Sequence, residues 1–193
     1  MGGIDVILLA AGRSSRLGQP KALVDADGQP LIQRLMSRLH QLQAEVTVVT
    51  NTDLLADIML LCPSAHVVLN PDPEKGRTGS VQCGLASILE RNGRLPRKVL
   101  LVPVDRPGWS VELVSHLLKS ETSACPVWNN RGGHPLLMVG DDVKAVYLAE
   151  VDAPLSSLIQ RKPLPVDFPW LHLNIDTEAD LVDLVAASKE DWF

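Results

Sequence analysis

The stretch Ile7–Val24 reads ILLAAGRSSRLGQPKALV and places a cluster of positive charge directly behind an apolar run. Residues 4–10 are almost continuously apolar, as expected for a strand covered on both faces. Gly12 and Gly18 follow the strand and let the backbone approach a ligand closely. Arginine and lysine side chains near these glycines suit phosphate oxygens. The stretch therefore predicts a buried strand followed by a loop that binds a pyrophosphate or triphosphate group.

Two widespread phosphate-binding motifs do not fit this loop. In the Walker A pattern GxxxxGK[ST] the lysine directly follows the second glycine, whereas Lys21 here follows Gly-Gln-Pro. The GxGxxG pattern of dinucleotide-binding folds is also missing. The cations available to an anion in this loop are Arg13, Arg16 and Lys21.

Strand-like and helix-like segments alternate along the first part of the chain. Apolar runs predict strands over 4–10, 45–51, 66–70 and 98–105. Apolar residues at helical spacing predict helices over 30–43, 53–61, 79–92 and 110–120, the last capped by Ser110. This alternation indicates a mostly parallel sheet with helices on both faces.

The second part of the chain is less regular. Strands are predicted over 123–129 and 134–139 as a small antiparallel addition, with short extended pieces over 164–168 and 171–175. Helices are predicted over 153–161 and 177–188, the last with Thr177 as its cap and Asp180 in a box-like position. No repeat or long linker divides the 193 residues, so we expect a single domain.

Composition narrows the class of partner. The net charge of −5 provides no broad basic field, so nucleic acid is not an expected partner and any anion binding must be local. The apolar runs are shorter than the roughly 20 residues of a membrane span, and no secretory signal pattern is present. The cysteines Cys62, Cys83 and Cys125 form no CxxC pair, which disfavours a zinc site. We expect a cytoplasmic protein that does not bind membranes.

Asp105 is the strongest catalytic candidate. It ends an apolar strand, where a carboxylate has no packing role. A hard oxygen ligand at that place suits Mg²⁺ that bridges phosphates. The alternative is a turn-forming residue before Pro107.

Five elements give most of the chain a resemblance to a known family. They are LAAGRSSRLGQPK (9–21), NPDPEKGRTGSVQCGL (70–85), LLVPVDRPG (100–108), GGHP (132–135) and NIDTEADL (174–181). In this order they are similar to signature elements of nucleotidyltransferases with a molybdopterin-nucleotide-transferase-like domain, and most of all to the molybdenum cofactor cytidylyltransferases. Leu17 stands where that signature usually has methionine.

The resemblance implies a fold and a reaction. The fold is a three-layer, Rossmann-like (GT-A-like) nucleotidyltransferase domain, with residues 1–108 as the nucleotide-binding half and 109–193 as the acceptor-binding half. The reaction couples a nucleoside triphosphate to a phosphorylated acceptor, with molybdopterin or molybdenum cofactor as a candidate, and releases pyrophosphate. The acceptor attacks the α-phosphorus in line, so the enzyme mainly positions two anions and stabilises charge.

The same resemblance implies nucleotide contacts. Arg16 and Lys21 would hold the triphosphate, with Lys21 closest to the charge developing at the α-phosphate. The backbone of residues 10–12 (Ala10, Ala11 and Gly12) would meet the base. Alanine at position 11 goes with cytosine and glycine with guanine, which makes CTP the first choice. Ser80, in the same element as Gly84, would meet the base or ribose; alternatively, Gly79 and Ser80 simply open a helix.

The metal and acceptor residues are less well determined. Asn174 replaces the first aspartate of the family's DIDT element, and its amide oxygen can still bind Mg²⁺. Asp176 competes with it, since strand alternation would put both on one face. His134 is expected at the acceptor site, although a core or turn histidine is an alternative.

The chain also departs from the family's pattern on the acceptor side. Val104 and Arg106 replace the usual neighbours of Asp105, and residues 149–161 read AEVDAPLSSLIQR instead of a GDxGAR-like stretch. A sugar- or polyol-phosphate nucleotidyltransferase therefore stays open, as does a non-catalytic nucleotide-binding regulatory domain. The joint presence of Arg16, Lys21 and Asp105 argues against the non-catalytic alternative.

Overall fold

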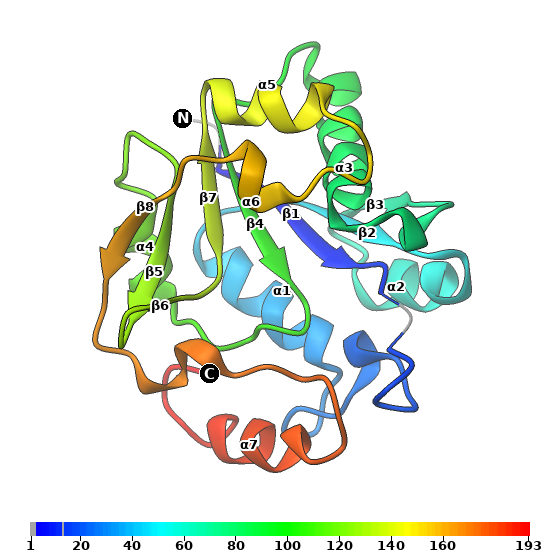
Figure 1. Cartoon of the computed structure of the whole chain (residues 1–193). Helices are drawn as coiled ribbons and strands as arrows, with labels where there is room; N and C mark the ends of the chain where they lie inside the picture. Colours follow the sequence, from blue (N-terminus) through cyan, green and yellow to red (C-terminus); the bar gives the residue numbers. More distant parts are fainter. Residues whose placement is uncertain (1–2, 13) are drawn as a thin grey trace.

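The centre of the fold is a parallel sheet made of β1 (Asp5–Ala10), β2 (Glu45–Thr50), β3 (His66–Leu69) and β4 (Lys98–Pro103). In the computed structural model, which describes residues 3–12 and 14–193, β1 lies between β2 and β4, and β3 pairs with β2 (Figure 1). These pairings are all parallel, which confirms the predicted sheet. The order β3-β2-β1-β4 changes direction at β1, so a crevice forms beside the carboxyl ends of β1 and β4.

Helices cover both faces of the sheet. One face carries α1 (Leu31–Gln41), α2 (Leu55–Leu61), α4 (Val111–Leu117) and α7 (Asp180–Ala187), and the other carries α3 (Arg77–Asn92) and α5 (Asp141–Leu148) (Figure 1). Successive side chains of β1 alternate between these layers: Val6 and Leu8 join the first core, and Ile7 and Leu9 join the second. This alternation explains the apolar run at the start of the chain and confirms the three-layer architecture.

The second part of the chain extends the sheet with mixed strands. β7 (Leu136–Val139) pairs antiparallel with β4, and β5 (Ala124–Trp128) pairs antiparallel with β7 and with β6 (Arg131–Gly132). β8 (Lys162–Pro165) pairs in parallel with β5. The antiparallel addition predicted from the sequence is confirmed.

Other parts of the second half differ from the prediction. The helix predicted over 153–161 shrinks to α6 (Leu155–Leu158), because the chain then extends to join β8 beside β5. The piece predicted as extended over 171–175 instead begins within the 3₁₀ turn η4 (Pro169–His172) and continues irregularly. Proline is favoured at the start of such a turn. The helix α5 was not predicted, although its first turn carries two aspartates, which favour a helix start.

Two helical segments begin with a side-chain cap. The hydroxyl of Ser110 accepts a hydrogen bond from the backbone N–H of Leu113 at 3.1 Å, which confirms the predicted cap of α4. Asn51 caps the 3₁₀ turn η2 (Thr52–Leu54) in the same way, through Leu54. Two further 3₁₀ turns, η1 (Lys21–Leu23) and η3 (Pro73–Lys75), flank the crevice at the sheet edge. Within residues 3–12 and 14–193, none of the helices combines the length and apolar composition needed to cross a bilayer.

Candidate active site

A cavity of about 290 Å³ opens at the carboxyl ends of β1 and β4. Open α/β sheets bind ligands at this position, where the strand order reverses. Six residues predicted from the sequence line the cavity: Ala10, Ala11, Gly12, Lys21, Ser80 and Asp105. Arg13, also predicted there, lies outside the described residues.

The loop after β1 folds back so that Lys21 reaches the cavity. Ser14 and Gly18 have positive φ angles of 53° and 73°, which turn the chain twice within a few residues. The Ser14 hydroxyl accepts a hydrogen bond from the backbone N–H of Lys21 at 3.1 Å. Leu17 is 1% exposed and packs in the core, where leucine and methionine are interchangeable in volume. The loop is thus anchored at Leu17 and presents Lys21 to the cavity.

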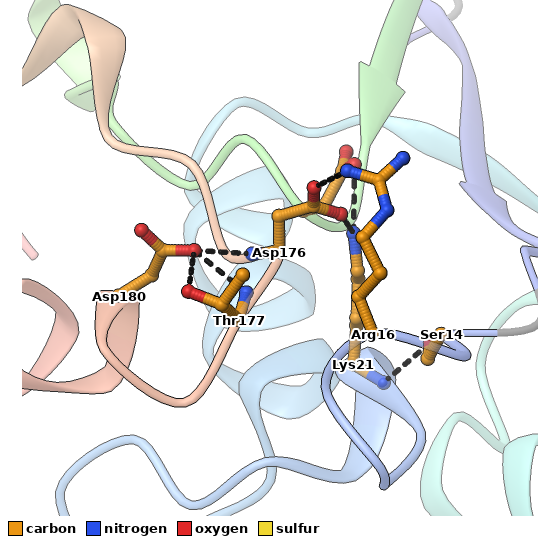
Figure 2. Close-up of polar contacts among 7 residues, drawn as sticks. Ser14, Arg16, Lys21, Asp176, Thr177 and Asp180 are labelled. Atoms are coloured by element: carbon orange, nitrogen blue, oxygen red, sulfur yellow. Dashed lines mark hydrogen bonds and ion pairs between the residues drawn. The ribbon is translucent and has the colours of Figure 1, made fainter.

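Lys21 joins two carboxylates that the chain brings together from distant positions. Its Nζ lies 2.9 Å from Oδ1 of Asp176 and 3.4 Å from Oδ2 of Asp105, and its side chain is only 13% exposed. Arg16 also pairs with Asp176, and Figure 2 shows both cations converging on that carboxylate. The hydrogen bond from Lys21 holds the pKa of Asp176 below its usual value. Without an added anion, the cations of the loop therefore neutralise the carboxylates.

Asp180 fixes the backbone that carries Asp176. Its Oδ2 accepts hydrogen bonds from the backbone N–H groups of Asp176, at 2.9 Å, and of Thr177, at 2.7 Å (Figure 2). The Thr177 hydroxyl donates to the same oxygen at 3.0 Å. These bonds hold the pKa of Asp180 below its usual value. The box-like position of Asp180 is thus confirmed, because its carboxylate reaches back to the backbone N–H of Thr177. The Thr177 hydroxyl, however, donates to Asp180 and does not cap the helix, and α7 starts three residues later than predicted.

The path of the chain places Asn174 and Asp176 differently. The carbonyl oxygen of Asp105 accepts a hydrogen bond from the backbone N–H of Ile175 at 2.9 Å, so this segment crosses the end of β4. Asp176 then reaches Lys21, whereas no hydrogen bond from the Asn174 side chain to this group is found among the described residues. The alternation argument fails because residues 173–176 do not form a strand.

His134 lies close to the cavity, two residues before β7 begins. The charges of Arg77 and Asp105, which both line the cavity, act on its imidazole. Burial, followed by the positive charges of Arg77 and Arg106, lowers the pKa of His134 to about 4. Its Nδ1 is buried and has no hydrogen-bond partner among the described residues.

Ser80 and Gly84, which share one sequence element, have different surroundings in the structure. Ser80 lines the cavity, and its hydroxyl accepts a hydrogen bond from the side-chain amide of Asn70 at 2.9 Å. It lies inside α3, which begins at Arg77, and therefore does not open the helix. Gly84 does not line the cavity: a Cβ atom there would lie 2.9 Å from the Ile7 side chain of β1. The structure therefore gives Gly84 a packing role, because it lets α3 approach the sheet.

The sequence analysis missed two buried asparagines that hold residues of the cavity lining in place. Asn51 follows β2, and its side-chain amide donates to the carbonyl oxygen of Ala11 at 3.1 Å. Asn70 follows β3 and holds Ser80. Asn51 follows a buried strand, the same signal that singled out Asp105, whereas Asn70 follows β3, whose residues are not buried. Arg77, which lines the cavity from the first turn of α3, was also missed.

The donor set suits a hard cation shared with a substrate. Asp105 and Asp176 supply carboxylate oxygens around one point, the ammonium group of Lys21. Among the described residues, no group of three or more histidine, cysteine, aspartate or glutamate side chains could hold a metal alone. Mg²⁺ is commonly bound in this way, by one or two carboxylates together with substrate phosphates.

Comparison with known proteins gives a consistent match. The family model described as MobA-like NTP transferase domain matches residues 6–167. A molybdenum cofactor guanylyltransferase from Sinorhizobium fredii is 29% identical over 99% of this chain and 92% of its own length. One from Xanthomonas euvesicatoria is 31% identical, over 65% of this chain and 59% of its own length.

The fold also matches solved structures. The crystal structure of Rv0371c from Mycobacterium tuberculosis H37Rv superposes with a TM-score of 0.80 at 20% identity, covering 95% of this chain and 98% of that chain. A complex of Rv0371C with manganese gives a TM-score of 0.77 at 17% identity, over 96% of this chain and 99% of that one.

Proposed function

The chain belongs to the MobA-like NTP transferase family and is a nucleotidyltransferase, and we propose that it transfers a nucleotidyl group from CTP to a phosphate of a molybdopterin-type acceptor. The observation that carries this proposal is that Lys21 and Asp105 line one cavity and that Lys21 also binds Asp176. The curated relatives are named molybdenum cofactor guanylyltransferases, and these names support a molybdopterin-type acceptor.

In the proposed reaction an acceptor phosphate oxygen attacks the α-phosphorus of the nucleotide. A P–O bond forms to the acceptor, the bond between the α-phosphorus and the bridging oxygen breaks, and pyrophosphate leaves. Lys21 and Arg16 exchange their contacts with Asp176 for the triphosphate oxygens. Because the Lys21 side chain is already held at the cavity by two carboxylates, it loses little further freedom on binding.

The proposed metal ligands are Asp105 and Asp176. When bound, Mg²⁺ would neutralise charge on the phosphate oxygens. In the free protein the carboxylates pair with Lys21 and Arg16, so a triphosphate that attracts these cations releases the carboxylates for the metal. We therefore expect nucleotide and divalent cation to strengthen each other's binding. The manganese complex of a structural neighbour supports a divalent cation in this fold.

Positive charge near His134 supports a site for the acceptor's phosphate. Arg77, Arg106 and Arg161 all contribute positive charge at this histidine. None of the three forms an ion pair with a carboxylate in the part of the chain that the structure describes. Because the protein is acidic overall, such unpaired cations indicate an anionic ligand. His134 and Arg161 come from the half 109–193 that we assign to the acceptor, and Arg77 and Arg106 join them from the nucleotide half.

The proposal of CTP depends on Ala11. This residue is 4% exposed and lines the cavity, and Asn51 holds its carbonyl oxygen in place. A methyl group on this fixed backbone leaves less room for a base than glycine would. GTP is the second candidate, because the curated relatives are named guanylyltransferases.

The test compares kcat/KM for CTP and GTP, with molybdopterin as acceptor, in the wild type and in Ala11→Gly. Discrimination by one packing contact is about 10–200-fold. We expect CTP to be preferred within this range and Ala11→Gly to narrow the gap. A wild-type preference for GTP would favour the second candidate, and a ratio unchanged by the substitution would remove Ala11 from the base site. The absence of transfer to molybdopterin with either nucleotide would contradict the proposed acceptor.

A further inference from the structure

Arg38 is a buried cation that the proposed reaction does not use. It lies in α1, is 3% exposed and forms no ion pair with a described carboxylate. Burial lowers the pKa of its guanidinium group to about 9, so the group stays charged at neutral pH. An unpaired buried charge is costly, and its contacts therefore need an explanation.

Those contacts are with the loop that follows Asp105. Nη1 of Arg38 donates hydrogen bonds to the carbonyl oxygens of Pro107, at 3.1 Å, and Trp109, at 2.5 Å. The guanidinium carbon lies 4.1 Å from the centre of the Trp109 ring and 4.8 Å from that of Phe193. Arg38 thus holds both the backbone and the aromatic anchor of the loop 105–109.

The other side of this loop packs against the segment that leads to Asp176. A Cβ atom on Gly108 would lie 1.9 Å from the carbonyl oxygen of Trp170, so the backbones touch directly. The carbonyl oxygen of Asp105 accepts the bond from Ile175. The loop is therefore held between Arg38 and the segment 170–176, and its position sets how Asp105 and Asp176 face each other.

We propose that Arg38 is a positioning residue, whose hydrogen bonds to the Pro107 and Trp109 carbonyls hold Asp105 at the spacing from Asp176 that the metal and nucleotide require. This inference rests on the proposed function, since it assumes that both carboxylates hold the cation. An apolar side chain of similar volume would fill the space but would leave the two carbonyl oxygens without this donor.

The test compares Arg38→Met and Arg38→Lys with the matched control Arg91→Met. Arg91 is also largely buried, but it pairs with Asp5 at the amino end of β1, the end opposite the cavity. We would measure Mn²⁺ affinity by electron paramagnetic resonance with nucleotide present, kcat and KM for the nucleotide, and the melting temperature. Loss of a residue that orients a metal ligand typically costs about 10–100-fold in metal affinity or activity.

We expect Arg38→Met to lower kcat and Mn²⁺ affinity by about 10–100-fold, with nucleotide KM changed by less than about threefold. Arg38→Lys, which keeps the charge and a donor, should recover part of both losses. Arg91→Met should lower the melting temperature while Mn²⁺ affinity and kcat stay at wild-type values.

Several outcomes would overturn the inference. If Arg38→Met folds and matches Arg91→Met in kcat and Mn²⁺ affinity, Arg38 is a core residue only. If Arg38→Met does not fold, Arg38→Lys decides the question: a loss of kcat at unchanged KM supports positioning, and wild-type kcat overturns it. A wild type that neither binds Mn²⁺ with nucleotide nor transfers a nucleotidyl group would contradict the proposed function itself.

Discussion

Replacing Lys21 by methionine removes the cation at the centre of the site while keeping most of its volume. Its ammonium group lies within 3.4 Å of both carboxylates, and its side chain is 13% exposed, so solvent screens it only in part. Two unit charges about 4 Å apart interact by about 4 kcal/mol at an effective dielectric constant of about 20. Since about 1.4 kcal/mol corresponds to a factor of ten in rate, this interaction sets an upper limit near 10³.

We therefore expect Lys21→Met to lower kcat by about 10²–10³, with a smaller effect on nucleotide KM, because the charge at the α-phosphate grows in the transition state. The assay is pyrophosphate release at saturating nucleotide and acceptor. Lys98→Met is the matched control: Lys98 is 21% exposed and pairs with Glu121, but it lies at the opposite end of β4. A rise in KM with unchanged kcat would refute the transition-state role of Lys21.

Lys21→Met should lower kcat, but it should raise the affinity of the nucleotide-free protein for a divalent metal. Without Lys21, Asp105 and Asp176 lose the cation that neutralises them. Mn²⁺ affinity in the absence of nucleotide should therefore rise, by at least about tenfold. Calorimetric titration of Lys21→Met and wild type checks this expectation. An unchanged or weaker Mn²⁺ affinity would show that Asp105 and Asp176, which Lys21 neutralises, do not bind the metal.

Three further substitutions test separate parts of the site. Asp105→Asn should leave the melting temperature within a few degrees of wild type and lower turnover by about 10³ or more; near-normal Mg²⁺-dependent pyrophosphate release would sink the assignment. Gly84→Ala should destabilise the protein by about 1–3 kcal/mol in denaturant titrations, because its Cβ would lie 2.9 Å from Ile7; a raised nucleotide KM at unchanged stability would instead return Gly84 to the nucleotide site. Asp180→Asn should lower kcat by about 10-fold by loosening Asp176, and unchanged kinetics would leave Asp180 a helix-start residue only.

The parts of the fold that could be predicted are those with a strong local pattern. The run at residues 4–10 is apolar on both faces because helices cover both faces of β1, so the pattern and the burial coincide. Residues 153–176 were predicted less well, since β8 forms only by pairing with β5, which is distant in sequence. A short segment whose conformation depends on such a partner carries little local signal.

The residues of the candidate site also fall into those that a local pattern predicts and those that depend on the path of the chain. Lys21 and Asp105 each follow a buried strand, and the common edge of a parallel sheet brings them together, so sequence reasoning could find both. The contact of Asp176 with Lys21 depends on how residues 170–176 cross the end of β4, which no local pattern reveals. Gly84 illustrates the reverse case: a glycine within a signature element serves helix packing and does not line the cavity.

The most direct test of the account is the fate of the α-phosphate. Purified protein would be incubated with molybdopterin, Mg²⁺ and α-³²P-labelled CTP, with Asp105→Asn as the blank. We predict that label passes to the acceptor, that one pyrophosphate is released for each label transferred, and that the blank shows neither. Pyrophosphate released without label on the acceptor, or label transferred equally well by Asp105→Asn, would contradict a nucleotidyl transfer centred on Lys21, Asp105 and Asp176.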